Sequence, residues 1–390
     1  MIEDIRALSL KYEQELISIR RHIHANPELS FEEYKTCEFI CRKLDEYGIR
    51  NKVIGKTGVV GIIEGTEPGS SCTALRADMD ALPILEENKI DYCSAIPGVM
   101  HACGHDVHTT CLLGAARILS ELKNRWNGTV KLIFQPGEEK NPGGASILIG
   151  EGVLEDPAPQ RIFALHVHPG LETGKFSFRG GMVMASADEI YITLRAKGGH
   201  AAAPQFTADP ILIASHIVIG LQQIISRNND PFNPSVLSIT SIQGGNTTNV
   251  IPSEVKMMGT FRAMNEEWRF RAHELIRNHI LQVSSAMSAS AEVSIDVGYP
   301  FVYNDPELSA RARRNAEMLA GKENVSESEL RMGAEDFAYY SHKIPACFFR
   351  LGAGNAAMGI TSNVHTPTFN VDEAAIAQGS AMMAWLAVSS

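Results

Sequence analysis

The hydrophobic and polar positions of the first half of the chain change period several times. A helical period predicts two N-terminal helices, from Asp4 to about His24 and from Phe31 to Tyr47, which Asn26-Pro27 separates. Short apolar runs then predict strands, and helical stretches stand between the later ones. The strands are expected at 58–65, 71–77, 129–134 and 161–166, and the helices at 106–122 and 144–149. Strands that alternate with helices predict an α/β fold with a mixed, mostly parallel sheet flanked by helices.

From about Ser186 the pattern becomes strand, helix, strand, strand, helix, strand. The strands are expected at 189–195, 235–242, 254–262 and 291–297, with helices from Asp209-Pro210 and over 266–283. This β-α-β-β-α-β order is the split, ferredoxin-like α+β arrangement. We therefore predict two domains, which the length also favours. Residues 1–185 and 299–390 form one discontinuous domain, and residues 186–298 form a domain inserted in it.

Composition narrows the classes of function. The 390 residues are 44% hydrophobic and carry a formal net charge of -10, which argues against nucleic acid or an anionic membrane as the main partner. The N-terminus lacks the pattern of a signal peptide, and no apolar run reaches the roughly 20 residues that span a bilayer. Seven cysteines are an odd and sparse set for a disulfide framework. We expect a soluble, cytoplasmic protein with reduced thiols.

Four polar clusters stand at the edges of these predicted elements. The segment Met100–His108 holds a thiol, three imidazoles and a carboxylate within nine residues. The other three are Gly137-Glu138-Glu139, Leu165–Pro169 and Asn363–Pro367. Ligands of open α/β sheets bind beyond the carboxyl ends of the strands, so we expect these distant clusters to form one site. Thiolate, imidazole and carboxylate are the donors that zinc prefers.

Each cluster also has a plainer interpretation. Two adjacent glutamates are commonly two exposed acids in a loop, but Glu138 and Glu139 follow an apolar strand. Because neighbouring side chains diverge, one of them can hold a metal ion while the other faces a water molecule. His166 and His168 share one strand face, and only one of them need be a ligand. His101 and His108 can be ordinary packing or capping residues. Cys103 could instead be a redox or nucleophilic thiol, although no resolving cysteine is close in sequence.

Eight segments, in this order, resemble the two-metal peptidase family that includes aminoacylase, carboxypeptidase G, hippurate hydrolase and the auxin-conjugate amidohydrolases. The chain most resembles the hippurate-hydrolase-like branch, and the likeness covers nearly its whole length. The segments are Arg20–Leu29, Arg76–Pro83, Met100–Asp106, Gln135–Glu139, Gly198–Pro204, Thr248–Pro252, Gly259–Arg262 and His365–Pro367. The resemblance implies a metal-dependent exopeptidase-like fold whose inserted domain serves as a lid and in dimerisation.

The resemblance also implies the residues that hold two divalent metal ions. Zinc is the expected metal, with manganese, cobalt or nickel as alternatives. Glu138 would be the general base that activates a metal-bound water, and Asp80 would hydrogen-bond a ligand histidine and fix its tautomer. The implied metal ligands are Cys103, His105, Glu139, His166 and His365, with Cys103 as the candidate bridge. Aminoacylase-like branches carry a ligand histidine at the place of Asp78, whose role here the sequence leaves open.

Three residues of the inserted domain are implied to bind substrate. Arg262 suits a free carboxylate, Asn249 suits a carbonyl or carboxylate oxygen, and His200 would stabilise the oxyanion. In dimers of the family this histidine reaches the active site of the other subunit, so we expect a homodimer or a larger homo-oligomer.

We therefore predict a metal-dependent amidohydrolase that cleaves N-acyl-L-amino acids. A carboxypeptidase or dipeptidase would use the same chemistry, because a peptide is an acylated amino acid. Deacetylation of N-acetyl-diaminopimelate is a further alternative. A non-catalytic metal-binding scaffold is the alternative from another class, but the base and all five implied ligands are present.

Overall fold

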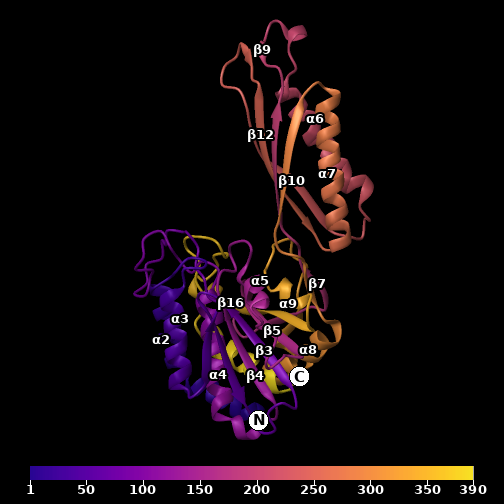
Figure 1. Ribbon diagram of the computed structural model, residues 1–390. Coiled ribbons are helices and arrows are strands. Elements are labelled where there is room, and N and C mark those ends of the chain that lie inside the picture. The colour runs from indigo at the N-terminus through magenta and orange to yellow at the C-terminus, as the bar shows by residue number, and fades with distance from the viewer. Residues whose placement is uncertain (390) are drawn as a thin grey trace. The chain divides into compact units, whose positions relative to one another are not determined.

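A computed structural model describes residues 1–389 of the chain, which form two compact units (Figure 1). Unit 1 comprises residues 1–183, 303–329 and 336–389. Unit 2 comprises Met184–Val302 and Leu330–Glu335. The boundaries of the inserted unit lie within a few residues of the predicted boundaries at 185/186 and 298/299. Nothing in the sequence indicates that the short segment Leu330–Glu335 belongs to unit 2. The lid and dimerisation roles of the insert stay predictions.

Unit 1 is built on an eight-stranded sheet in the order β1-β2-β4-β3-β5-β16-β6-β15. The central pairs β4–β3, β3–β5 and β5–β16 are parallel, whereas β1–β2, β2–β4 and β16–β6 are antiparallel. The predicted mixed, mostly parallel sheet is thus confirmed. The strands are β1 (Arg50–Ile54), β2 (Gly58–Glu64), β3 (Cys72–Asp78), β4 (Thr129–Gln135), β5 (Arg161–Glu172), β6 (Phe176–Phe178), β15 (Val325–Glu327) and β16 (Ala346–Gly354).

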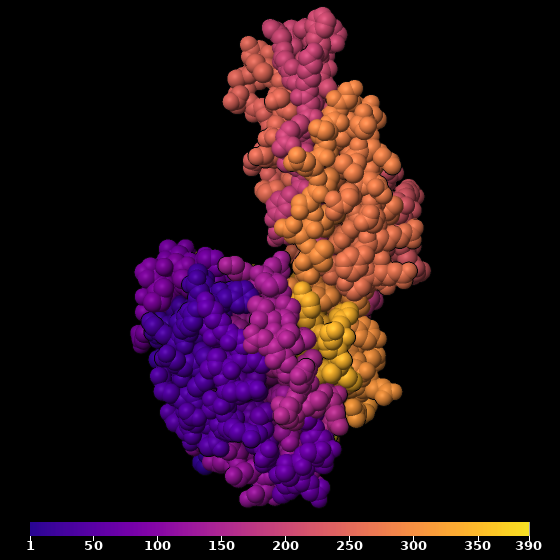
Figure 2. Space-filling model, in the orientation of Figure 1, coloured from indigo at the N-terminus to yellow at the C-terminus, as the bar shows by residue number. Residues whose placement is uncertain are grey.

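Helices flank this sheet, and the N-terminal part of the chain, in indigo, forms the left of the visible face of unit 1 in Figure 2. The most deeply placed is α4, which is buried on nearly all sides and packs against α10. Because nearly every residue of α4 is buried, the residues at its start are held by packing from every side. The helices are α1 (Ile2–Lys11), α2 (Glu13–Ala25), α3 (Tyr34–Glu46), α4 (His105–Glu121), α5 (Gly144–Gly150), α8 (Pro306–Ala320), α9 (Ala338–Ser341) and α10 (Ala374–Ser389).

Two expectations about the N-terminal helices are wrong. The helix predicted from Asp4 to His24 is interrupted at Tyr12, which caps the end of α1 and the start of α2. The second helix begins at Tyr34 instead of Phe31, because Phe31 adopts a φ of 66° that no right-handed helix contains. That turn brings residues 31–33 to the site described below.

Unit 2 is an antiparallel sheet in the order β10-β12-β8-β13, with two long helices packed on it. Along β8, buried and exposed residues alternate, as the sequence period predicts. The predicted β-α-β-β-α-β order is confirmed. The elements are β8 (Asp188–Arg195), α6 (Pro210–Gln223), β10 (Ser235–Gln243), β12 (Glu254–Ala263), α7 (Glu266–Ala286) and β13 (Ser290–Val297). A separate two-stranded antiparallel sheet pairs β9 (Gly199–His200) with β11 (Val250–Ile251), and β7 (Gly181–Met184) and β14 (Val302–Asn304) are short strands.

Helix α6 continues into a short π-helical segment, Ile224–Asn228. Together they form 19 residues that are long and apolar enough to cross a membrane by length and composition, a run that was not expected from the sequence. Ile213, Ile217 and Leu221 of this helix are buried in the core of unit 2. Burial on one face is what a core helix of a folded domain requires, and it explains much of the apolar composition.

Candidate metal centre

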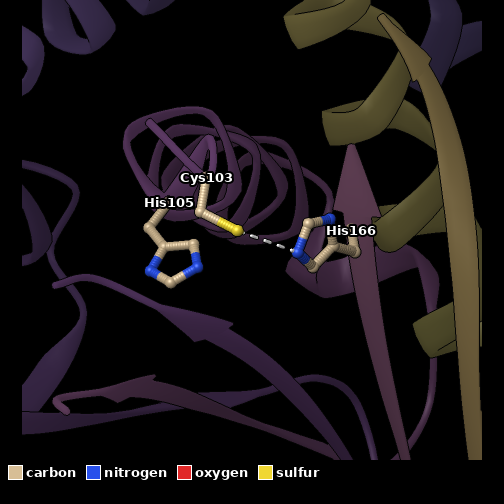
Figure 3. A group of neighbouring side chains, drawn as sticks. All are labelled: Cys103, His105 and His166. Carbon is tan, nitrogen blue, oxygen red and sulfur yellow. Dashed lines mark hydrogen bonds between the residues drawn. The ribbon is translucent and has the colours of Figure 1, made fainter. Parts of the chain in front are cut away.

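The five predicted metal ligands all lie in unit 1 at the carboxyl-terminal edge of its sheet. The Cys103 Sγ atom lies 3.4 Å from His166 Nε2 and 3.3 Å from His365 Nε2. Figure 3 shows the first of these contacts, with His105 beside it. The donor atoms form two overlapping groups in which all atoms lie within 4.8 Å of one another. One group is Cys103, His105 and His166, and the other is Cys103, Glu139 and His365, so the sulfur belongs to both.

Two glycines allow the chain to make the turns that carry these side chains. Gly104 has a φ of 87°, and a Cβ there would lie 2.4 Å from Val167 Cγ2, so only glycine fits between Cys103 and the start of α4. Gly137 has a φ of 59°, and a Cβ there would lie 2.3 Å from the Phe31 ring. Its N–H donates to Glu33 Oε1 (2.8 Å), which anchors the loop after β4.

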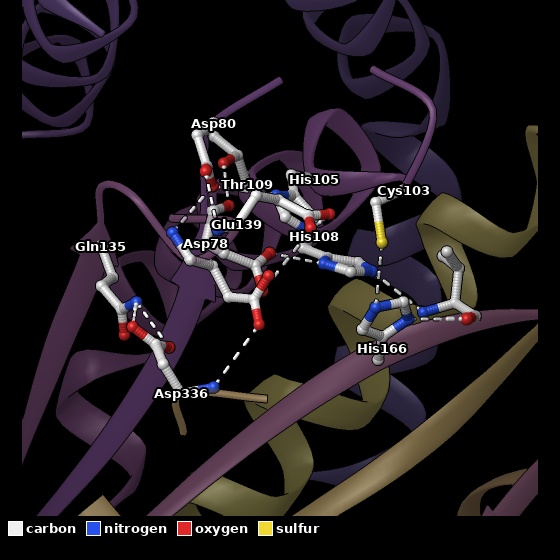
Figure 4. A network of polar contacts seen from close by, with 12 residues as sticks. Asp78, Asp80, Cys103, His105, His108, Thr109, Gln135, Glu139, His166 and Asp336 are labelled. Carbon is white, nitrogen blue, oxygen red and sulfur yellow. Dashed lines mark hydrogen bonds and ion pairs between the residues drawn. The ribbon is translucent and has the colours of Figure 1, made fainter. Parts of the chain in front are cut away.

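Asp80 holds three parts of the site at once. Its Oδ1 accepts from His105 Nδ1 (3.1 Å) and the Glu138 N–H (3.1 Å), and its Oδ2 accepts from the Glu139 N–H (3.0 Å) and Ser30 Oγ (2.6 Å). In the neutral ring the hydrogen on Nδ1 donates to Asp80, so Nε2 is the nitrogen with the lone pair. Figure 4 shows Asp80 above this group of side chains.

The other two histidines also present Nε2. His166 Nδ1 donates to the carbonyl oxygen of Val167 (2.8 Å), which leaves Nε2 facing the sulfur. His365 Nε2 lies 3.2 Å from Glu139 Oε1 as well as near Cys103. The Asp80 carboxylate and the Val167 carbonyl therefore orient the rings of His105 and His166 before any metal binds, as outer partners of metal ligands do.

The pKa values show an excess of negative charge at this edge. Burial alone would lower the pKa of His105, but the charges of Asp78 and Cys103 raise it well above its usual value. Hydrogen bonds to Cys103 and Glu139 raise the pKa of His365 to about 10. Burial and the Glu139 charge raise the pKa of the Cys103 thiol. Burial, together with the nearby His108 and Arg350, holds the pKa of His166 well below its usual value. A cation placed among these groups would be stabilised.

The donor set fits a divalent metal ion on this structure's own evidence. His105 Nε2 is buried and takes part in no hydrogen bond within the described residues. Such an atom costs free energy unless a ligand pairs with it. Thiolate, imidazole and carboxylate donors suit zinc and its neighbours in the first transition row. Burial and the Glu139 charge raise the pKa of Cys103 although His105 and His365 lower it, and this net rise argues against a free nucleophilic thiolate.

Glu138 is buried, and its Oε1 accepts from the Asp336 N–H (3.4 Å). The expectation that Glu138 and Glu139 diverge is not met, since an oxygen of each lies within 4.8 Å of the other and of a His105 nitrogen. The reason is the turn at Gly137, which is not extended, so the strand rule of alternating sides does not apply after β4.

Several polar residues beside the ligands carried no clear sequence signal. Asp78 bonds to His108, and Glu33 accepts from Gly137, Phe31 and Thr57. The spacing of these residues could have indicated the pairing of the two aspartates with the two histidines. Asp78 and Asp80 are two residues apart at the end of one strand, and His105 and His108 share one helix face. His101 is buried with neither ring nitrogen hydrogen-bonded, and it joins no group of possible metal donors in the described part of the chain.

The three predicted substrate-binding residues lie in unit 2, at two separate places. His200 and Asn249 are exposed neighbours at the β9–β11 strand pair, where the Ala201 N–H donates to the Asn249 carbonyl (3.0 Å). Arg262 is half-buried near the other end of β12, and its Nε donates to Thr260 Oγ1 (3.1 Å). The eight residue-to-residue steps from Glu254 to Arg262 span roughly 26 Å at the usual rise of a strand.

Known proteins are similar in sequence to this chain over most of its length. Residues 74–389 match the family described as Peptidase family M20/M25/M40. The chain is 38% identical to thermostable carboxypeptidase 2 of Saccharolobus solfataricus, over 100% of this chain and 98% of that protein. It is 39% identical to IAA-amino acid hydrolase ILR1-like 5 of Arabidopsis thaliana, over 95% of this chain and 86% of that protein.

A solved structure shares the fold. The crystal structure of a dinuclear metal binding peptidase of the M20 family from Bacillus subtilis superimposes with a TM-score of 0.83, at 36% identity, over 97% of this chain and 98% of that one. The predicted fold class and the predicted class of metal-dependent amidohydrolase are thereby confirmed. The match over most of the length, the identity to whole relatives and the shared fold establish that the chain belongs to peptidase family M20/M25/M40.

Proposed function

We propose that this chain hydrolyses the amide bond of N-acyl-L-amino acids and releases a carboxylic acid and a free amino acid. The observation that carries the proposal is the sulfur of Cys103, which lies within 3.4 Å of both His166 and His365 and close to the Glu138–Glu139 loop. Relatives named for hydrolysis of IAA-amino acids support an acylated amino acid as the substrate.

Two divalent ions are part of the proposal. Two donor groups share Cys103, and the Bacillus subtilis relative is titled a dinuclear metal binding peptidase. Zinc suits the donors, with manganese, cobalt and nickel as alternatives, and Cys103 is the proposed bridge. When bound, such ions polarise a carbonyl group and lower the pKa of a water molecule.

The chain's own residues would move the proton. Glu138 takes a proton from the attacking water as the new C–O bond forms, and it gives that proton to the leaving nitrogen as the C–N bond breaks. Asp80 supports this role, because it fixes the amide groups of Glu138 and Glu139 and the ring of His105. A base held by its own backbone needs little reorganisation during the reaction.

Arg262 is proposed to bind the free carboxylate of the substrate. Its guanidinium is half-buried, has no carboxylate partner among the residues described, and has its pKa lowered by burial. A two-pronged bond to a carboxylate would satisfy such a group. His200 and Asn249 would bind the scissile group, but roughly 26 Å of strand separates them from Arg262.

That separation supports the predicted homodimer. No N-acyl amino acid spans such a length, so a substrate on Arg262 would meet His200 of the partner subunit and Asn249 of the partner subunit. Helix α6 offers apolar side chains for such a contact, since Ile211, Leu212 and Ile219 are exposed. A cytoplasmic location belongs to the same proposal, and the seven free thiols support it.

A carboxypeptidase is the second candidate, favoured by the relative named thermostable carboxypeptidase 2. One assay separates the two. Metal-free protein is reloaded with zinc, manganese, cobalt or nickel in turn. It is then given N-acetyl, N-benzoyl and indole-3-acetyl derivatives of one amino acid and dipeptides ending in that residue, and release of the amino acid is measured. We expect activity that chelators abolish, and a higher kcat/KM for the acylated amino acids. A higher kcat/KM for the dipeptides would favour the carboxypeptidase, and no release from any substrate would refute both.

A further inference from the structure

Two fully buried residues beside the metal centre have no part in the chemistry proposed above. Asp78 ends strand β3, and His108 lies in the first turn of α4. Asp78 and His108 repeat the arrangement of Asp80 and His105. Two carboxylates that are two residues apart accept hydrogen bonds from two imidazoles that are three residues apart on α4. Figure 4 shows His108 between Asp78 and His166.

Hydrogen bonds fix the tautomer of His108. The Val167 N–H donates to His108 Nε2 (2.9 Å), so that nitrogen carries a lone pair and no hydrogen. The hydrogen of the neutral ring is then on Nδ1, which donates to Asp78 Oδ1 (2.5 Å). Arg76 donates to the other oxygen of Asp78 (2.6 Å). Both nitrogens of His108 are thus occupied, so this ring has none to offer a metal ion, although it lies within 4.8 Å of His105 and Asp78 donors.

The bond to Val167 replaces a missing strand partner. The parallel register of β3 with β5 ends at the pair Arg76 and Ala164, while β16 continues to pair with β5 on the other side. Beyond Ala164 the backbone groups of β5 that face β3 need another partner, since an unpaired buried amide costs free energy. His108 provides that partner at Val167.

Val167 connects this bond to two predicted ligands. Its carbonyl accepts from His166 Nδ1 (2.8 Å), and that bond turns His166 Nε2 toward the sulfur. Its side chain lies against the position where Gly104 has no Cβ, between Cys103 and His105. A shift of the Val167 backbone would therefore move the ring of His166 relative to Cys103.

We propose that Asp78 and His108 are positioning residues that hold the Val167 amide and thereby orient the ring of His166 toward the metal centre. This inference rests on the proposed function, because it concerns the affinity of the proposed metal ions. In the branches where a histidine ligand stands at the place of Asp78, the residue would bind the metal itself. In this chain it acts through His108.

Two substitutions of His108 separate the two ends of the ring. His108→Asn keeps a donor near the Nδ1 position for Asp78 but does not reach Val167, whereas His108→Gln reaches about as far as Nε2 and offers an oxygen to the Val167 amide. We expect His108→Asn to weaken the binding of one of the two ions about 10- to 100-fold, and His108→Gln to recover most of that affinity. Leu112→Ala, a buried change one turn further along α4, controls for lost stability.

Metal affinity is measured by competition with a chromogenic chelator, and the cobalt-loaded proteins are compared by their thiolate-to-cobalt absorption band. The proposal predicts an altered band for His108→Asn and unaltered bands for His108→Gln and Leu112→Ala. Wild-type affinity in His108→Asn, or an equal loss in His108→Gln, would overturn it. If the wild-type protein does not bind two metal ions, the proposed metal centre itself is refuted. Failure of the positioning role and failure of the metal centre therefore give different results.

Discussion

Asp80→Asn is the most informative single substitution in unit 1, because it keeps the size of a side chain that accepts four hydrogen bonds away from solvent. Each carboxylate oxygen accepts two of them, so an amide nitrogen in either place faces two donors. The less costly orientation puts this nitrogen beside Ser30, whose hydroxyl can rotate and accept. The Glu139 N–H is then left without a partner, and His105 loses a charged acceptor.

The expected cost follows from these contacts. One bond to a charged group contributes about 1.5–3 kcal/mol, and the weakened bond to His105 adds to it, so we expect the metal-free protein to lose about 3 kcal/mol. Ser30→Ala removes one donor only and should cost about 1 kcal/mol. Metal affinity should fall about 10- to 100-fold in Asp80→Asn, because the His105 ring is no longer held in one tautomer.

Urea unfolding of the metal-free protein measures the loss. Trp268 lies in unit 2, whereas Trp126 and Trp385 lie in unit 1, so a Trp268→Phe background makes fluorescence report on unit 1 alone. The urea dependence should keep its slope while the midpoint falls. A loss below about 0.5 kcal/mol, together with unchanged metal affinity, would refute the role of Asp80 as the residue that holds the site together.

Three further predictions concern catalysis and charge. Glu138→Gln should keep the metal content seen by elemental analysis and lower kcat about 10²- to 10⁴-fold, whereas Glu139→Gln should lose metal; full activity of the former would remove Glu138 from its role. Arg262→Ala should raise KM about 10- to 100-fold for substrates with a free carboxylate and leave their methyl esters unaffected, and equal effects on both would contradict carboxylate binding. The pKa of His365, raised to about 10, and the raised pKa of Cys103 mean that both are protonated near pH 7 without metal. Calorimetric titration in two buffers should therefore show protons released on metal binding, and metal-free protein should lose stability as the pH rises from about 6.5 toward 10, a loss that loaded protein should not show.

Periodicity was enough to predict most of the fold, because the central strands and helices bury one consistent set of positions. It failed where burial is slight. Strand β1 buries only Ile54 of its five residues, so its sequence has no apolar alternation, and only pairing with β2 makes it a strand. The interruption at Tyr12 also left no trace, since the residues before and after it turn buried side chains toward the same core.

The candidate ligands were recognisable because Glu139 and His166 follow apolar strands and because the family resemblance implied the whole set. The residues that hold them were not, because their partners come from distant parts of the chain. In the sequence Glu33 is an ordinary acid in a polar loop. In the structure it is buried, because the turn at Phe31 places its carboxylate beside the loop at Gly137. A sequence shows which groups can donate or accept, but only the fold shows which of them meet.

The charges at this sheet edge connect the metal centre to the stability of unit 1. Asp78, Asp80 and Glu138 are buried there, and Arg76 is shared between Asp78 and Asp336. Without a metal ion, protons on His105 and His365 balance the remaining negative charge, which is why the pKa values of these rings are raised. Divalent ions would take the place of those protons at the same nitrogen atoms. Metal binding then replaces protons with metal ions, while hydrogen bonds keep the surrounding side chains in place. Acid should therefore remove the metal at a pH where unit 1 is still folded.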